Sequence, residues 1–331
     1  MIPNQWYPIC FGREVRGRPL ALRRMGQDLV AWRDGRGTVV VMNDRCPHRG
    51  AARSQGHVRD GQLECPWHGF RFDESGVCRH IPAEGADAKI PSGLSTPPYS
   101  VKEGHGLVWL FWHPDAPNVS PSVQLPPLPW FESFDSDDRT IARSAIDWPV
   151  NHVRSIEANF DVHHFPFVHR SVFPGMGKRV DPYEVNVDGT RICTRGEIRR
   201  EGSSKGFSFE IDFEAPSIMR LAFGGFSFVV ADCPIDDYAT RRLVIYQQRW
   251  IRVPGIGRLL SWVFMMLDWK WVQNRQDLKI AATQTPQLPD LAIEHLIGAD
   301  GGTAAYRKLR HRLLREAGVA SASEITPRPE A

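Results

Sequence analysis

The chain has 331 residues, of which 42% are hydrophobic and 24% charged, and its formal net charge is +3. This composition is typical of a globular protein, and the length allows two domains or one large one. The small net charge, without basic runs interleaved with aromatic residues, argues against nucleic acid as a partner.

The N-terminus has no basic region followed by an apolar run, so we expect no signal peptide. The longest apolar stretch, 259–267, is too short for a membrane span, and we interpret it as core helix rather than membrane contact. We therefore expect a cytoplasmic protein. Six cysteines in such a chain do not suggest a disulfide framework, so cysteines near histidines are considered first as metal ligands.

From residue 6 to about residue 112, short β-type runs alternate with turn signals, which predicts a small all-β module. The candidate strands are 20–23, 28–32, 38–43, 62–64 and 107–112.

Two loops of this module each contain one cysteine and one histidine. Cys46 and His48 stand in C-P-H-R-G, and Cys65 and His68 stand in C-P-W-H-G-F. The four side chains could hold a tetrahedral zinc, or a [2Fe-2S] cluster with both cysteines on one iron and both histidines on the other. Zinc modules usually group two cysteines as C-x-x-C, so two equivalent loops favour the cluster. Unrelated core residues are the remaining alternative.

A proline-rich segment, 114–130, predicts a boundary between two parts of the chain. A strand is expected at 141–146, and later strands separated by turns predict an antiparallel meander. Two helices are expected at 258–284 and 304–317, and the basic side of the second is interpreted as a solvated face. The meander strands are 191–200, 207–213, 217–222, 227–231 and 241–250.

The stretch 157–169 contains two carboxylates and three imidazoles, and two histidines with one carboxylate are a ligand set for ferrous iron. On a regular helix His164 and His169 would lie about 140° apart and would not converge on one ion. Because Pro166 disturbs a helix interior, we predict that a helix ends or kinks near Phe165 and turns His169 back towards His164. Ordinary histidines at a helix end are the alternative.

Asp277 lies on the predicted helix 258–284, on the same face as Leu259, Val263 and Gln273. A carboxylate on an otherwise apolar helix face is costly to bury without a partner. That partner could be a metal ion, or an arginine from a neighbouring strand.

The paired loops resemble the Rieske domain of Rieske non-haem iron oxygenases, over about residues 5–115. The pattern D-x-x-H-x4-H from Asp161 to His169, together with Asp277, resembles their catalytic domain. The resemblance implies an α+β fold, with an all-β Rieske [2Fe-2S] domain followed by a helix-grip domain, an antiparallel sheet with a long C-terminal helix. The expected divisions are a Rieske domain at 1–115, a connector at 116–140, a catalytic domain at 141–318 and a disordered tail at 319–331.

The resemblance also implies roles for the residues. The four loop residues would hold the Rieske cluster, and His164, His169 and Asp277 would bind mononuclear Fe(II), with O₂ as co-substrate. Asp161 would link His164 to His68 of the partner subunit in a head-to-tail homotrimer, and is the expected catalytic residue. Electrons would come from NAD(P)H through a flavin reductase, a ferredoxin or both.

The implied reaction is hydroxylation or oxidative demethylation of an apolar, aromatic or polycyclic small molecule, by an enzyme resembling the vanillate and dicamba demethylases. A desaturase or oxidative cyclase, or a Rieske electron carrier without catalysis, are the alternatives. Many relatives have an asparagine three or four residues before the bridging aspartate, whereas here Ala158 and Glu157 hold those positions and Asn159 stands two before it. His163 is expected to be structural or gating, not a ligand.

Overall fold

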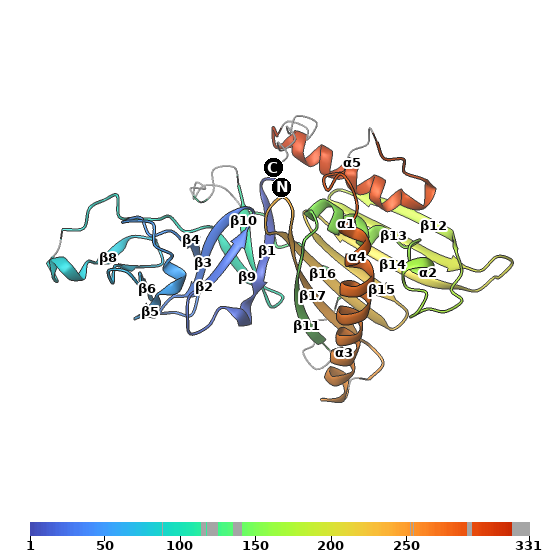
Figure 1. The fold of residues 1–331 in the computed structure, drawn as a ribbon, viewed down its shortest axis with the longest axis horizontal. Coiled ribbons are helices and arrows are strands. Elements are labelled where there is room, and N and C mark those ends of the chain that lie inside the picture. The colour runs from blue at the N-terminus through green and yellow to red at the C-terminus, as the bar shows by residue number, and fades with distance from the viewer. Residues whose placement is uncertain are drawn as a thin grey trace.

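The computed structural model describes residues 1–87, 89–113, 117, 125–134, 141–251, 253, 255–289 and 293–319. They form two parts that lie side by side along the longest axis of the molecule (Figure 1). Most of the predicted connector and nearly all of the predicted tail lie outside the described residues, so the proposed domain limits stay predictions.

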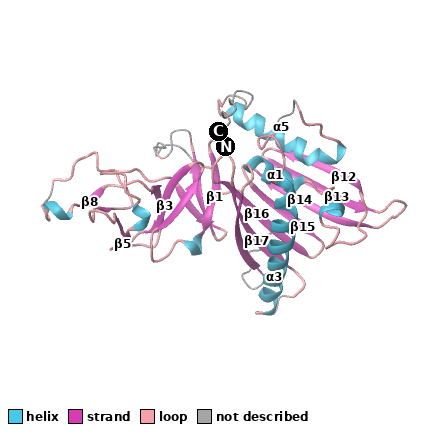
Figure 2. Cartoon of the chain, in the orientation of Figure 1, coloured by secondary structure: helices cyan, strands magenta, loops and turns pink. Residues whose placement is uncertain are grey.

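The first part is all-β, as predicted, and is built from small antiparallel sheets with the orders β1-β10-β9, β2-β3-β4 and β5-β6-β7-β8 (Figure 2). Its strands are β1 (Gln5–Phe11), β2 (Leu20–Arg24), β3 (Gln27–Arg33), β4 (Val39–Asn43), β5 (His57–Arg59), β6 (Gln62–Glu64), β7 (Arg71–Phe72), β8 (Cys78–His80), β9 (Val101–Gly104) and β10 (Leu107–Trp112). Short 3₁₀ turns lie at Gly12–Glu14, Arg53–Gln55 and Pro82–Glu84.

Strand β10 joins the two parts of the molecule. Its sequence is apolar throughout because both of its faces are buried. Val108 and Leu110 point into the core of the first part, whereas Leu107, Trp109 and Phe111 pack against strands of the second part. The two parts therefore share an apolar core at their junction.

The second part contains a seven-stranded antiparallel sheet in the order β11-β17-β16-β15-β14-β13-β12. Its strands are β11 (Ile141–Trp148), β12 (Arg179–Asp188), β13 (Arg191–Arg199), β14 (Gly206–Glu214), β15 (Ile218–Phe223), β16 (Phe226–Pro234) and β17 (Thr240–Gln248). The predicted meander is confirmed, and β12 is the strand that the prediction lacks. Its alternation of half-buried and exposed residues, at the edge of the sheet, gives only a weak apolar signal.

Helices cover the sheet of the second part. A long rod made of α3, a π-helical segment and α4 crosses the sheet, and α5 lies at one end of it (Figures 1 and 2). The α+β fold with a long late helix is thus confirmed. The helices are α1 (His152–Phe160), α2 (Phe165–Val168), α3 (Ile256–Leu267), the π-helix (Asp268–Asp277), α4 (Leu278–Ala281) and α5 (Gly301–Glu316), with a 3₁₀ turn at Gly298–Asp300.

The π-helical segment overturns one expectation from the sequence. We placed Asp277 on one regular helix face with Leu259 and Val263, but a π-helix has more residues per turn, so the face shifts along Asp268–Asp277. Leu259 is 58% exposed and Val263 40% exposed, so the interpretation of 259–267 as core holds only for part of the stretch, chiefly Ser261 and Met265. No helix among the described residues is long and apolar enough to cross a membrane.

The basic side of α5 is only partly a solvated face. Arg307 is largely buried and donates to both carboxylate oxygens of Glu157 on α1, at 2.6 and 3.0 Å. Arg154 and Glu294 complete this network. The network fixes α5 to α1, and α1 leads directly into the histidine-rich stretch.

Candidate functional site

The two loops with one cysteine and one histidine each have the same backbone turn. Gly50 N–H donates to the carbonyl of Cys46, and Gly69 N–H donates to the carbonyl of Cys65. Both glycines have a positive φ, near 76° and 71°, which a residue with a Cβ rarely adopts. The sequence therefore folds both loops tightly around their cysteines.

The four loop side chains meet as two pairs. The thiols of Cys46 and Cys65 are buried and within hydrogen-bonding reach of each other. The rings of His48 and His68 lie with their centroids 4.8 Å apart. In the described structure, no three of these four donor atoms lie within 4.8 Å of one another, as the ligands of a single ion would. A pair of neighbouring thiols and a pair of neighbouring imidazoles fit a [2Fe-2S] cluster better than a zinc ion.

Arg53 lies behind this loop pair and was not singled out from the sequence. Its side chain is fully buried, lies 4.9 Å from the centre of the Phe72 ring, and donates to the carbonyl of Asn43. Its Nε and Nη1 have no hydrogen-bond partner among the described residues. Burial lowers the pKa of Arg53 to about 10, and the nearby Cys46 thiol opposes that shift, so the side chain is a buried cation at neutral pH.

The second centre begins where α1 ends. The side chain of Asn151 accepts from Val153 N–H and caps the start of α1, which ends at Phe160. The predicted break is confirmed, but its position and cause differ. Pro166 stands in the first turn of the new helix α2, where its missing N–H costs nothing, so it starts a helix instead of ending one.

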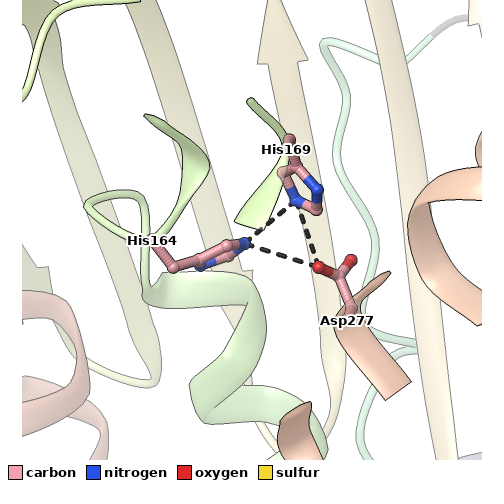
Figure 3. Close-up of side chains that lie close together, drawn as sticks. All are labelled: His164, His169 and Asp277. Atoms are coloured by element: carbon pink, nitrogen blue, oxygen red, sulfur yellow. Dashed lines mark hydrogen bonds and ion pairs between the residues drawn. The ribbon is translucent and has the colours of Figure 1, made fainter. Parts of the chain in front are cut away.

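His164 and His169 flank this short helix, and their imidazoles converge. Their Nε2 atoms are 3.1 Å apart, and Asp277 Oδ1 lies 3.1 Å from Nε2 of His169 and 3.6 Å from Nε2 of His164 (Figure 3). Asp277 Oδ1 is buried and accepts no hydrogen bond from any described residue. Two imidazoles and one carboxylate oxygen that face one point fit a divalent transition metal such as iron.

The far sides of both imidazoles are held by acceptors. Asp161 Oδ2 lies 3.4 Å from Nδ1 of His164, and its Oδ1 accepts from the His164 backbone N–H at 3.1 Å. Gln276 Oε1 lies 2.8 Å from Nδ1 of His169, and the Gln276 amide donates to Ser171 Oγ. Such acceptors fix the tautomer that leaves Nε2 free for a metal. Sequence reasoning found Asp161 and missed Gln276, although Gln276 directly precedes Asp277.

Burial alone would raise the pKa of Asp161, but its hydrogen bond to His164 and the charges of His164 and His163 lower it below the usual value. His163 turns away from the converging atoms, as expected, and its Nε2 lies 3.0 Å from Asp300 Oδ1. Glu157 belongs to the ion-pair network of α5. Asn159 Oδ1 accepts from Arg242 at 2.6 Å, and Asn159 lines the same cavity as the three converging side chains without being one of them.

A cavity of about 650 Å³ opens beside these ligands. Its wall is mainly aromatic and aliphatic, with side chains from α2, from the sheet and from the rod of α3 and the π-helix. Phe165 and Phe207 are among the aromatic side chains that line it. Phe160 and Phe209 are core, Met266 packs against that core, and Phe167 and Trp262 are exposed.

The polar part of the cavity wall includes two carboxylates, Asp268 and Asp277. Asp268 Oδ2 accepts from Tyr246 Oη and from Gln273 Nε2, both at 2.5 Å. Burial raises the pKa of Asp268 to about 6. Gln273 Oε1 is buried and has no hydrogen-bond partner in the described structure. Arg242 also borders the cavity, but its guanidinium is committed to Asp232 and to the neighbouring asparagine.

Comparison with known proteins matches residues 5–98 to the Rieske [2Fe-2S] domain. Protein TIC 55 of Arabidopsis thaliana, described as chloroplastic, is 33% identical over 92% of this chain and 58% of its own length. The Pisum sativum protein of that name is matched over 39% of its length, so the chain spans about half of these relatives. The 4beta-methylsterol monooxygenase of Methylococcus capsulatus is 31% identical over 78% of this chain and 71% of its own length.

Solved structures show the same fold. Dicamba monooxygenase bound to dicamba superposes with a TM-score of 0.77 at 18% identity, covering 96% of this chain and 99% of the other. NdmA of Pseudomonas putida CBB5 with caffeine, in a QL mutant, gives a TM-score of 0.73 at 22% identity, covering 98% of both chains. The paired Rieske loops, the shared fold and the methylsterol monooxygenase relative together show that the chain belongs to the Rieske oxygenase family.

Proposed function

We propose that the protein is an O₂-dependent oxygenase that hydroxylates or oxidatively demethylates an apolar small molecule. The observation that supports this most strongly is the convergence of His164, His169 and Asp277 at the wall of a large apolar cavity. A Rieske electron carrier would need neither the converging ligands nor the cavity.

In the proposed site, Cys46, His48, Cys65 and His68 hold a [2Fe-2S] cluster, and the three converging side chains hold one iron. When bound, these groups supply single-electron transfer and the activation of O₂. The protein holds both iron-binding imidazoles in one tautomer through their Nδ1 atoms. The apolar cavity binds the substrate beside the ligands and keeps bulk water away from it.

We further propose that electrons reach the iron from the cluster of a partner subunit. Figure 1 supports this, because β5 and β8 of the cluster part lie at the opposite end of the molecule from α2. Asp161 keeps about a third of its side chain exposed beside His164, so it is accessible to His68 of the partner subunit. A head-to-tail homotrimer closes such a contact. NAD(P)H and a flavin reductase or ferredoxin are the proposed electron source.

The cavity wall indicates which substrates fit. Asp268 and Asp277 disfavour a carboxylate substrate, and Arg242 is already paired, so no cation of the described wall is left for an anionic group. The unpartnered Oε1 of Gln273 suits a hydroxyl or N–H donor. We propose a neutral, ring-shaped substrate with one such donor. Two relatives are named for a sterol and a methylxanthine.

Desaturation is a second candidate reaction. A relative in Aquincola tertiaricarbonis, 31% identical over 50% of this chain, is named both a tert-butanol monooxygenase and a tert-amyl alcohol desaturase. Turnover under ¹⁸O₂ separates the two, because oxygen insertion leaves label in the product and desaturation does not. An unlabelled product would refute oxygen insertion.

Metal analysis tests the site itself. The proposal expects two irons from the cluster and one from the mononuclear centre in each chain. Asp277→Ala should remove the mononuclear iron and keep the visible spectrum of the cluster, while Asp300→Ala, a matched control outside the ligand group, should keep both. Asp161→Asn should keep both metals and stop turnover. Loss of the cluster in Asp277→Ala would show that Asp277 is structural. The expected cytoplasmic location stays a prediction, since TIC 55 is described as chloroplastic.

A further inference from the structure

Helix α3 exposes its large apolar side chains, whereas an ordinary surface helix buries them. The side that packs against the sheet carries small or flexible residues, Gly257, Ser261 and Met265. The exposed side carries large apolar ones. This apolar face of α3 consists of Ile256, Leu259, Trp262, Val263 and Leu267, each at least 40% exposed. A helix of a globular protein normally buries its apolar stripe, so this face is built to be covered by something else.

The apolar face of α3 continues into the cavity mouth. Trp250, Phe264, Leu267 and Trp271 are all exposed at the surface and also line the cavity beside the metal ligands. Phe264 stacks on Phe226 inside the cavity, with ring centroids 3.9 Å apart. A single apolar surface therefore runs from the outside of α3 to the interior. Figure 1 shows α3 in front of the large sheet, at its lower end and beside β11.

The exposed charged residues along the rod of α3, the π-helix and α4 are all basic. The stretch 249–267 contains three arginines and no acidic residue. Of these, Arg249 and Arg258 are exposed, and Arg258 lies near enough to Arg13 to affect its ionisation. Exposed Lys270 follows the helix. Tryptophans beside an apolar face, with arginine and lysine at its rim, are the composition of helices that lie in a lipid–water interface.

We propose that the apolar face of α3 binds the surface of an anionic lipid bilayer, with the cavity mouth towards the lipid. A two-fold contact with a second copy fits less well, because it would bring the basic rim of one copy against that of the other. A lipid surface supplies negative headgroups for the rim and hydrocarbon for the apolar side chains. The entry of an apolar substrate from the lipid rests on the proposed function, whereas the binding itself does not.

Co-sedimentation with lipid vesicles tests the proposal. The full chain with its metals is mixed with vesicles of phosphatidylcholine alone, or of phosphatidylcholine and phosphatidylglycerol in equal parts. The wild type should bind the anionic vesicles and bind the neutral ones weakly. Leu259→Glu/Trp262→Glu should bind at least about tenfold more weakly, because two exposed apolar side chains that would enter the lipid are replaced by charges. Arg258→Glu should reduce the preference for anionic lipid.

Val187→Glu is the matched control, since Val187 is an exposed apolar residue of β12 far from α3 in the fold. It should bind vesicles as the wild type does. The proposal is overturned if the wild type does not bind the anionic vesicles, or if the double variant binds them equally well. It is also overturned if the double variant only dissociates an oligomer in light scattering, since a second copy then covers the face. The vesicle assay contains no substrate or reductase, so a negative result does not bear on the proposed function. Conversely, a protein that binds vesicles but is inactive would contradict the proposed function and not the membrane-binding surface.

Discussion

Replacing Arg242 with methionine tests the buried ion pair beneath the cavity. Arg242 and Asp232 are 2% and 1% exposed, and Nε of the arginine lies 3.3 Å from Oδ1 of the aspartate. Arg242 also lies over the ring of Trp148 and donates to Asn159, while Ser155 donates to the other oxygen of Asp232. The pair thus connects the sheet to α1, which leads into the histidine-rich stretch.

The size of the effect follows from this geometry. At 3.3 Å and an effective dielectric constant of about 20, the attraction is about 5 kcal/mol. Desolvation offsets most of it in the intact pair, but Arg242→Met leaves a buried carboxylate without its cation, which costs about 3–5 kcal/mol of unfolding free energy. Arg242→Met/Asp232→Asn should recover at least half of that loss, because the introduced amide is neutral and its oxygen still accepts from Ser155.

Urea unfolding of the metal-loaded protein, followed by circular dichroism, measures these changes. Arg195→Met is the matched control, since the exposed Arg195–Glu210 pair should contribute about 1 kcal/mol or less. Burial raises the pKa of Asp232 even beside its arginine, and Arg242→Met raises it further. The folded state then binds the proton more tightly than the unfolded state, so the deficit of the variant should shrink as pH falls from about 7 to about 5. A cost below about 1 kcal/mol, or a deficit equal at both pH values, would refute this reasoning.

Three further changes have definite expected outcomes. Gln276→Leu leaves Nδ1 of His169 without its acceptor and should weaken iron binding about ten- to a hundredfold. Iron titration of the iron-free protein measures this, and an unchanged affinity would contradict it. Arg53→Leu removes a buried cation near Cys46 and should lower the reduction potential of the cluster, because the reduced cluster carries more negative charge; a redox titration that finds the same potential contradicts this. Asp268, with its pKa raised by burial to about 6, makes the folded protein less stable as pH rises from about 4 to about 6, so Asp268→Asn should flatten that part of the urea midpoint curve.

Local spacing pointed to the cluster loops and to the two histidines of the second candidate centre. Each cluster loop is short and self-contained, so the order of cysteine, histidine and glycine along Cys46 to Gly50 already determines its shape. His164 and His169 are close in sequence, and the resemblance to a family pattern connected them with the distant Asp277. The structure brings these three side chains together, and metal analysis is the test of their role.

The parts that sequence reasoning missed depend on geometry that a regular helix does not have. The expectation for Leu259 and Asp277 assumed 3.6 residues per turn across a segment that is a π-helix from Asp268 to Asp277. For the same reason Gln276 was not expected beside His169. The outward apolar side of α3 was interpreted as core because a periodic apolar pattern does not show whether the apolar side faces the core or the surface.

The two candidate centres differ in how much of the chain must be synthesised before all of their ligands are present. All four cluster donors lie between residues 46 and 68, within loops that complete their hydrogen bonds locally. The histidines of the second centre face a carboxylate more than a hundred residues later in the sequence. Because domains generally fold from the N-terminus as they leave the ribosome, the proposed cluster site would have all its donors before the second part has been synthesised. The proposed mononuclear site would be complete only after the rod of α3 and the π-helix has docked, so its metal would be the last to bind.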